Sequence, residues 1–216
     1  MLLSSRHVEP MAQPDTLSTI AFLRARDLTF SHGGHAVLGP LNFSVGPGLT
    51  WVCGGDGKGK TTLLRLMAGR LQPTQGTLVF DAKTVFDEGC SDPSLDETSA
   101  QTWLADLQPL FPGWDHALHS QLGEALGLAD HLHKPLFMLS AGSRRKVGLL
   151  AAAASGAHLT LLDVPFAALD APSSRALTQV LQSASKNNTR AWVVADYERP
   201  AWVLGLGRAR LIELGD

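Results

Sequence analysis

The sequence predicts an α/β sheet domain that carries a helical insert. Strand-like and helix-like segments alternate in the first and last thirds of the chain. A glycine-rich loop, residues 54–62, joins an apolar strand-like segment to a helical run. The middle of the chain shows apolar residues at helical spacing only. The length of 216 residues suits one domain with a proper core.

Residues 1–19 come before the first strand-like segment and lack the apolar run of a signal peptide. We expect a flexible tail here, and Met11 is an alternative start of the protein. The remaining residues, 20–216, form the single expected domain.

The first third of this domain is predicted to be rich in strands. Apolar and polar residues alternate in residues 20–30 and 41–45, as they do in half-buried strands. A Gly-Pro-Gly turn then leads into the apolar residues 49–53, which predict a buried strand. A helical run, residues 60–71, follows the glycine-rich loop, and residues 76–81 predict the next strand.

The helical subdomain is expected at about residues 87–140. Two groups of apolar residues recur there at helical spacing: Trp103, Leu104 and Leu107, then Leu118, Leu122, Ala125 and Leu126. Pro109 and Pro112 separate the two helices. Trp103 and Trp114 are either core anchors or docking residues, and the sequence leaves both interpretations open.

Strand-like and helix-like segments alternate again in the last third of the chain. The expected elements are a strand at 158–163, a helix at 173–185, a strand at 191–195, a helix or turn near Glu198, and a strand at 210–214. The apolar tract 147–162 is shorter than the roughly 20 residues of a membrane span and is interrupted by Ser155 and Gly156. We therefore expect a buried helix followed by a buried strand.

The composition restricts the class of partner. Hydrophobic residues make up 44% of the chain and charged residues 18%, which is typical of a globular protein. The formal net charge of −2 gives no broad basic face, so we expect no nucleic-acid partner. Cys53 and Cys90 form no disulfide framework, which indicates a reduced, cytosolic setting.

The glycine-rich loop has the spacing of a phosphate-binding loop. The sequence GGDGKGKTT fits G-x-x-x-x-G-K-[ST] through Gly54, Gly59, Lys60 and Thr61. The glycines let backbone N–H groups and a helix N-terminus face an anion. Lys60 is expected to reach the β and γ phosphates, and Thr61 to ligate Mg²⁺. The predicted nucleotide-binding residues are Gly54, Gly55, Asp56, Gly57, Lys58, Gly59, Lys60, Thr61 and Thr62.

Two further motifs follow in the chain. Asp163 ends an apolar strand, where the second acid directed at Mg²⁺ lies in phosphate-loop enzymes. Alone such an acid is usually structural, but the phosphate loop makes a metal-binding role the better interpretation. The sequence LSAGSRRKV begins at residue 139 and places Ser140, Ala141 and Gly142 at the start of a helix. This run is either an anion cradle or a plain helix cap.

The order of these motifs, ending in LTLLDVPFAALD, closely resembles the ATP-binding subunit of ABC transporters. The resemblance covers about residues 20–214. It implies an ABC-type P-loop NTPase fold with a mostly parallel core sheet, an N-terminal antiparallel β part and a helical subdomain. The compact size is similar to that of small stand-alone subunits such as the haem-exporter ATPase. ATP and Mg²⁺ are the implied cofactors.

The resemblance also implies partners. Two copies, or this chain and another ATP-binding subunit, are expected to form a head-to-tail dimer that drives an integral-membrane permease. Ser140, Ala141 and Gly142 of one copy would cover ATP on the other, and Asp170 lies in the turn that crosses the interface. His32 falls where relatives stack an aromatic ring on adenine, although an exposed turn histidine explains it equally well. The implied location is cytoplasmic, peripheral on the membrane.

Three positions depart from the family pattern. Val164 occupies the place of the catalytic glutamate, and Asp196 that of the switch histidine. Residues 90–93 best match the glutamine loop but contain no glutamine, and Gln101 comes too late, inside an expected helix. We therefore expect tight Mg-ATP binding with weak hydrolysis, in which Lys60 is the retained catalytic residue. Alternatives are that Asp196 or Glu198 replaces the missing base, or that a partner subunit keeps its own glutamate.

Other functions carry less weight. A soluble, non-transport ABC protein that acts as an ATP-dependent switch is the main alternative, and an unrelated P-loop kinase leaves the LSAGSRRKV motif unexplained. Four histidines near one another in the sequence suggest a metal site, but no acid or cysteine cluster joins them, so a solvated helix surface is favoured. These histidines are His116, His119, His131 and His133.

Overall fold

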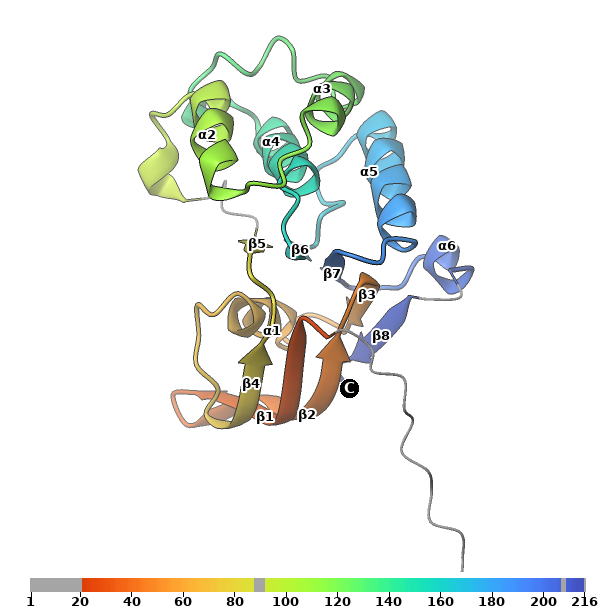
Figure 1. Ribbon diagram of the computed structural model, residues 1–216. Helices are drawn as coiled ribbons and strands as arrows, with labels where there is room; N and C mark the ends of the chain where they lie inside the picture. Colours follow the sequence, from red (N-terminus) through yellow and green to blue (C-terminus); the bar gives the residue numbers. More distant parts are fainter. Residues whose placement is uncertain (1–20, 88–91, 207–208, 216) are drawn as a thin grey trace, which may run out of the picture.

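Two sheets organise the chain in the computed structural model, which describes residues 21–87, 92–206 and 209–215 (Figure 1). The smaller sheet is antiparallel, with the strand order β2 (His35–Val45), β1 (Leu23–His32) and β4 (Gln75–Phe80). The larger sheet is parallel, with the order β5 (Val85–Asp87), β6 (Leu159–Asp163), β7 (Ala191–Asp196), β3 (Gly48–Cys53) and β8 (Arg210–Glu213). The predicted α/β class, with its mostly parallel core and N-terminal antiparallel part, is confirmed.

The first hairpin turns at two glycines. His32 of β1 pairs with His35 of β2, and Gly33 and Gly34 between them have φ angles of 57° and 81°. Two-residue hairpin turns of this kind need positive φ, which glycine adopts without strain. The second strand begins earlier than expected, because Gly39 and Pro40 interrupt its alternation. The strand continues past them through a register shift between the pairs Leu28–Leu41 and Phe30–Leu38.

Helix α1 (Lys60–Met67) follows the phosphate loop and is shorter than the predicted run. Gly69 adopts a φ of 72°, and the N–H groups of Arg70 and Leu71 bond back to the carbonyl of Arg65. This left-handed glycine closes the last turn and stops the helix.

The parallel sheet is covered on both faces. Trp192 and Val194 of β7 belong to a core cluster shared with α4 (Ala141–Ala154) and α5 (Ala171–Ala184). Val193 and Ala195, which point to the opposite face, belong to a second cluster with α1 and the antiparallel sheet. Strand side chains alternate between faces, so a strand apolar on both sides needs a layer on each.

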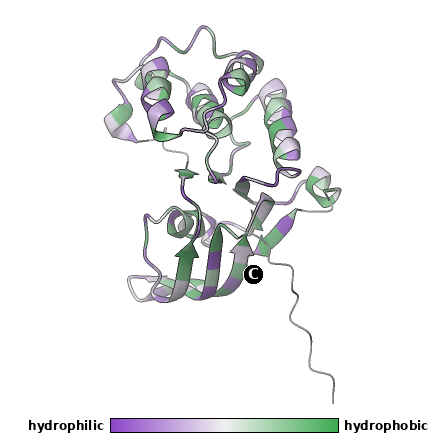
Figure 2. Ribbon diagram, in the orientation of Figure 1, coloured by the Kyte–Doolittle hydropathy of each residue, from purple (hydrophilic) through white to green (hydrophobic). Residues whose placement is uncertain are grey.

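The helical subdomain contains α2 (Ala100–Leu107) and α3 (His116–Ala125), which lie with α4 above the sheet in Figure 1. Their N-caps are side chains: Ser99 accepts a bond from Thr102 N, and Asp115 from Leu118 N. Helices α2, α3 and α5 each carry both hydrophobic and hydrophilic residues, as Figure 2 shows. The described part of this region also contains three short 3₁₀ helices, Pro93–Leu95, Gln108–Leu110 and Leu136–Met138.

Two tryptophans left open by the sequence are core residues. Trp103 and Trp114 retain only 6% and 8% of their exposed surface, and both belong to the cluster that α4 and α5 complete. Trp114 Nε1 also donates to His119 Nδ1 over 3.2 Å. Their burial excludes them as docking residues on the surface of this chain.

The C-terminal elements follow the predicted order. Glu198 lies in a bend, and the helix expected near it, α6 (Ala201–Leu204), begins three residues later. The apolar tract divides into α4 and β6 as expected. Within the described ranges, no helix is both long enough and apolar enough to cross a bilayer.

Candidate functional site

The phosphate loop connects β3 to α1, with Gly57 and Gly59 at φ angles of 72° and 86°. A Cβ at Gly59 would lie 2.6 Å from Leu38 Cδ2, so both its conformation and its surroundings require glycine. Lys60 is buried, and its ammonium group donates to Gly54 O at 2.6 Å and Gly55 O at 2.7 Å. The lysine side chain thus folds back over its own loop.

A cavity of about 220 Å³ lies against this loop. Its lining residues are Val37, Asp56, Gly57, Lys58, Gly59, Lys60, Thr61, Thr62, Asp163, Val164 and Tyr197. Most of the predicted loop therefore faces one space, while Gly54 and Gly55 supply the carbonyls that hold Lys60. The hairpin contributes Val37 to the lining, and His32 is an exposed residue at its tip. The adenine role of His32 stays a prediction.

Thr61 and Asp163 meet at the cavity wall. Thr61 Oγ1 donates to Asp163 Oδ2 over 2.6 Å, although the two residues come from α1 and β6. Asp163 Oδ1 is buried and has no hydrogen-bond partner among the described residues. A buried acceptor without a donor needs an explanation, and a cation is one. A hydroxyl and a carboxylate oxygen suit Mg²⁺, which takes its other ligands from water and phosphate.

Val164 lies directly beside Asp163 and lines the same cavity. Its φ is 44°, a left-handed conformation that a β-branched residue rarely adopts. The conformation is held on both sides: Val164 N donates to Ala195 O at 2.8 Å, and Arg145 Nη1 donates to Val164 O at 2.7 Å and Asp163 O at 3.0 Å. Strain of this kind costs about 1–3 kcal/mol and is common at functional sites.

Asp196 ends β7 next to this position. Because Asp163 pairs with Ala195, Asp196 lies one residue further along the neighbouring strand than Asp163. Its carboxylate accepts a bond from Tyr197 N at 2.8 Å. Burial raises the pKa of Asp196, a trend that the nearby Lys60 ammonium opposes. The cavity lining includes neither Asp196 nor Glu198, so the geometry gives no support to either as a replacement base.

Tyr197 is the site residue that the sequence analysis missed. Its ring centroid lies 4.4 Å from Lys60 Nζ, and the ring lines the cavity. The nearby Asp56 carboxylate raises the pKa of its hydroxyl. The available signal was its position directly after Asp196, in the loop where the family pattern places a residue that senses the γ phosphate.

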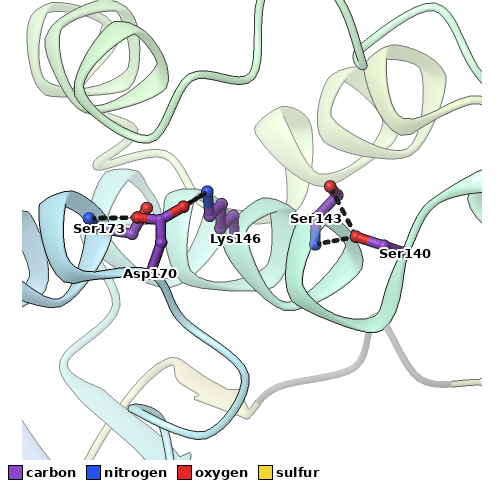
Figure 3. Close-up of polar contacts among 5 residues, drawn as sticks. All are labelled: Ser140, Ser143, Lys146, Asp170 and Ser173. Atoms are coloured by element: carbon purple, nitrogen blue, oxygen red, sulfur yellow. Dashed lines mark hydrogen bonds and ion pairs between the residues drawn. The ribbon is translucent and has the colours of Figure 1, made fainter.

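The signature residues lie at the start of α4, away from the cavity lining. Ser140 is the N-cap, and its hydroxyl accepts a bond from Ser143 N at 3.1 Å (Figure 3). A Cβ at Gly142 would lie 2.6 Å from Ala168 O, so glycine allows the close approach of the AALD turn. The cavity lining among the described residues includes none of residues 140–142.

Basic residues after the signature hold neighbouring segments in place. Lys146 Nζ lies 2.6 Å from Asp170 Oδ2, and Asp170 Oδ1 accepts from Ser173 N at 2.8 Å (Figure 3). Both bonds lower the pKa of Asp170, and the bond from Lys146 has the largest effect. Arg144 forms an ion pair with Asp96 at 2.7 Å. Lys146, Arg144 and Arg145 therefore all have partners within the chain.

A larger cavity of about 490 Å³ adjoins the first and shares Thr61, Asp163 and Val164 with it. Its other lining residues are Leu64, Arg65, Arg70, Asp87, Asp92, Arg145 and Leu161. Cys90 and Ser91 of the expected glutamine loop lie outside the described residues. Asp92, at the end of that loop, lines this cavity, whereas Gln101 is exposed on α2.

The histidines of the helical subdomain do not gather around a metal. Within residues 21–87, 92–206 and 209–215, no group of three or more His, Cys, Asp or Glu side chains is placed to hold one. His116 is exposed as expected. His119 is half-buried under Trp114, and burial lowers its pKa, so the expected solvated surface is wrong for this residue.

The chain is similar in sequence to known ATP-binding proteins. The sequence profile of the ABC transporter family matches residues 38–167. The chain is 32% identical over 208 residues to the cytochrome c biogenesis ATP-binding export protein CcmA of Cupriavidus pinatubonensis, covering 88% of this chain and 91% of the relative. It is 30% identical over 197 residues to the bicarbonate transport ATP-binding protein CmpD of Synechocystis, covering 83% and 70%.

Solved structures show the same fold. An ABC transporter ATP-binding protein of Pyrococcus furiosus has a TM-score of 0.71 at 22% identity, covering 89% of this chain and 96% of that one. The archaeal ribosome recycling factor aABCE1 gives 0.73 at 20% identity, covering 95% of this chain and 39% of its own. The family profile and the relatives' names favour transport over the soluble switch. The chain therefore belongs to the ABC transporter family and is one of its ATP-binding subunits.

Proposed function

We propose that this subunit binds Mg-ATP at the small cavity and uses the binding energy to close a dimer against a membrane permease, with slow hydrolysis. The observation that carries the proposal is the convergence of Lys60, Thr61 and the unpartnered Asp163 Oδ1 on one space. An ammonium group, a hydroxyl and a carboxylate oxygen at a helix N-terminus match the needs of a phosphate chain and its cation.

The proposed nucleotide contacts follow from the loop. Backbone N–H groups of residues 56–62 would face the phosphates, and Lys60 would exchange the carbonyls of Gly54 and Gly55 for phosphate oxygens. Thr61 and Asp163 would hold Mg²⁺, which neutralises charge on the phosphates when bound. The hydrogen bond between these two residues already sets their oxygen atoms side by side.

Weak hydrolysis is proposed because Val164 offers no base. Its alkyl side chain lines the cavity beside Asp163, where a water molecule would have to lose a proton. General-base help is typically worth about 10²–10⁴-fold in rate. Asp196 adds a carboxylate near the phosphate site, which opposes contact with a γ phosphate.

A head-to-tail dimer would complete the site. Ser140, Ala141 and Gly142 start a helix on a surface separate from the phosphate loop, so they are free to meet a second copy. In a two-fold homodimer both sites would be equivalent. A heterodimer with a subunit that keeps its glutamate remains compatible with the same surface.

The permease contact is proposed on the helical subdomain, which would place the subunit peripherally on the cytoplasmic face of the membrane. Leu110, Phe137 and Met138 expose more than half of their surface there. Exposed apolar side chains in one region are typical of an interaction site. Relatives of nearly equal identity are named for cytochrome c biogenesis export and bicarbonate transport, so the cargo is assigned to the permease.

Isothermal titration calorimetry tests the proposal. Mg-ATP should bind the wild-type protein at micromolar to sub-millimolar concentration, and Lys60→Ala should weaken binding at least about tenfold because a charge-assisted contact is lost. Lys83→Met is the matched control, since Lys83 is an exposed lysine outside both cavities. Lack of binding up to millimolar nucleotide would overturn the function. Turnover above about 1 s⁻¹ would overturn the weak-hydrolysis part.

A further inference from the structure

Tyr197 covers the ammonium group that the phosphate loop would offer to a nucleotide. Lys60 Nζ donates to Gly54 O at 2.6 Å and Gly55 O at 2.7 Å, and it lies over the Tyr197 ring, whose centroid is 4.4 Å away. The two carbonyls belong to the loop itself, but the ring comes from the segment after β7. An aromatic face attracts a cation, so this contact is favourable without any ligand.

The hydroxyl end of the same side chain lies beside the phosphate loop. The carboxylate of Asp56, a loop residue, is near enough to the Tyr197 hydroxyl to raise its pKa. Asp56, Lys60 and Tyr197 all line the small cavity, so the side chain adjoins the loop on this side of the site.

The same ring is able to leave. Tyr197 is 49% exposed, and it lies in a bend whose backbone is anchored by the bond from its N–H to Asp196 Oδ1. A rotation of the side chain would release Lys60 while the anchored backbone keeps its position. The Tyr197 ring and a phosphate group would compete for the same Lys60 ammonium group. Tyr197 also forms part of the wall of the cavity of about 220 Å³.

We propose that Tyr197 is a displaceable cover of the phosphate site, which competes with the nucleotide for Lys60 and must swing away when ATP or ADP binds. The inference rests on the proposed function. It assigns a role to Tyr197, the residue next to Asp196. The covered state lowers the affinity for nucleotide, because a nucleotide that binds only when the ring has left Lys60 must also supply the free energy that displaces the ring.

The chain contains a single tyrosine, which gives a direct probe of the cover. Biosynthetic incorporation of 3-fluorotyrosine labels Tyr197 alone. Saturating Mg-ADP and Mg-ATP should each move or sharpen the ¹⁹F resonance as the ring leaves Lys60 and enters solvent. An unchanged resonance under conditions where calorimetry shows full nucleotide occupancy would overturn the cover.

Affinity provides a second test. Tyr197→Ala should bind both Mg-ADP and Mg-ATP about threefold to thirtyfold more tightly than wild type, the range expected for the loss of one cation–π contact. Tyr197→Phe should lie between them, because it keeps the ring over Lys60 but lacks the hydroxyl beside Asp56. Leu204→Ala is the control: Leu204 is a comparably exposed side chain on α6 and should leave affinity unchanged.

The outcomes separate this inference from the function on which it rests. Equal affinity of wild type and Tyr197→Ala overturns the cover alone. Weaker ATP binding by Tyr197→Phe with unchanged ADP binding also overturns it, and indicates instead a hydroxyl contact to the terminal phosphate. Absence of nucleotide binding in all variants overturns the proposed function, and the cover with it.

Discussion

Lys146 Nζ lies 2.6 Å from Asp170 Oδ2, which joins the second turn of the signature helix to the N-cap of α5 (Figure 3). Asp170 Oδ1 caps the helix through Ser173 N, so one carboxylate serves both contacts. The pair fixes the AALD turn relative to residues 140–142. In the proposed dimer both segments face the second copy, and their relative position sets the shape of that surface.

Replacing Lys146 by methionine should therefore destabilise the protein in a pH-dependent manner. The pKa of Asp170 is lowered by Lys146, so the pair stabilises the fold above the ordinary carboxyl pKa of 3.8. That contribution is lost as the pH falls below this value toward the lowered pKa. Urea unfolding should show Lys146→Met less stable than wild type at pH 7, with the difference shrinking below about pH 4.

The control for this prediction is Arg24→Met, which removes the exposed ion pair with Asp81 at 3.1 Å. Exposed pairs contribute little, so this variant should unfold like wild type. Equal stability of Lys146→Met and wild type at pH 7 would contradict the prediction.

Val164→Glu should raise ATP hydrolysis. The residue lines the cavity beside Asp163, and a carboxylate there would supply the missing base. A gain of up to about 10²–10⁴-fold is expected in steady-state turnover, and the left-handed backbone will reduce it if the new side chain is turned away. Val164→Gln is the matched control, because it has the same shape without basicity. A gain shared by both variants would refute base catalysis.

The backbone of Val164 gives a separate stability prediction. At a φ of 44°, asparagine is tolerated far better than a β-branched residue. Val164→Asn should be more stable than Val164→Thr by about 1 kcal/mol, within the usual range of backbone strain. Both variants are polar, so the comparison isolates the branched Cβ. Urea unfolding at pH 7 measures it, and a Thr variant as stable as the Asn variant would argue against strain.

Features that depend on a short stretch of sequence could be predicted from the sequence. Lys60, Thr61 and Asp163 were located because a buried strand precedes each motif and glycine spacing restricts the loop. The strand β5 was missed because three residues are too few to show alternation, and the start of β2 because Gly39 and Pro40 break it.

Contacts between distant segments could not be predicted in this way. The ring of Tyr197 over Lys60 depends on the parallel register of β3 and β7, which sets Cys53 against Asp196. Periodicity places residues on a face, but the identity of the neighbour on that face comes from tertiary packing.

Asp196→Asn should increase both stability and nucleotide affinity. Burial raises the pKa of Asp196, so its ionised form costs the folded protein stability at neutral pH. This cost is fully present above the raised pKa and disappears as the pH falls below 3.8, where the carboxyl is protonated in both the folded and the unfolded protein. The asparagine oxygen can still accept the bond from Tyr197 N, so the backbone anchor is preserved.

Calorimetry should show Mg-ATP binding about threefold to tenfold more tightly to Asp196→Asn, because a negative charge near Lys60 and Asp163 is removed. Urea unfolding should show a gain at pH 7 that is smaller at pH 4. Glu198→Gln is the matched control, since Glu198 is an exposed carboxylate two residues away and outside the cavity. If Glu198→Gln raised affinity as much, the effect would be one of net charge, and Asp196 would have no special place in the site.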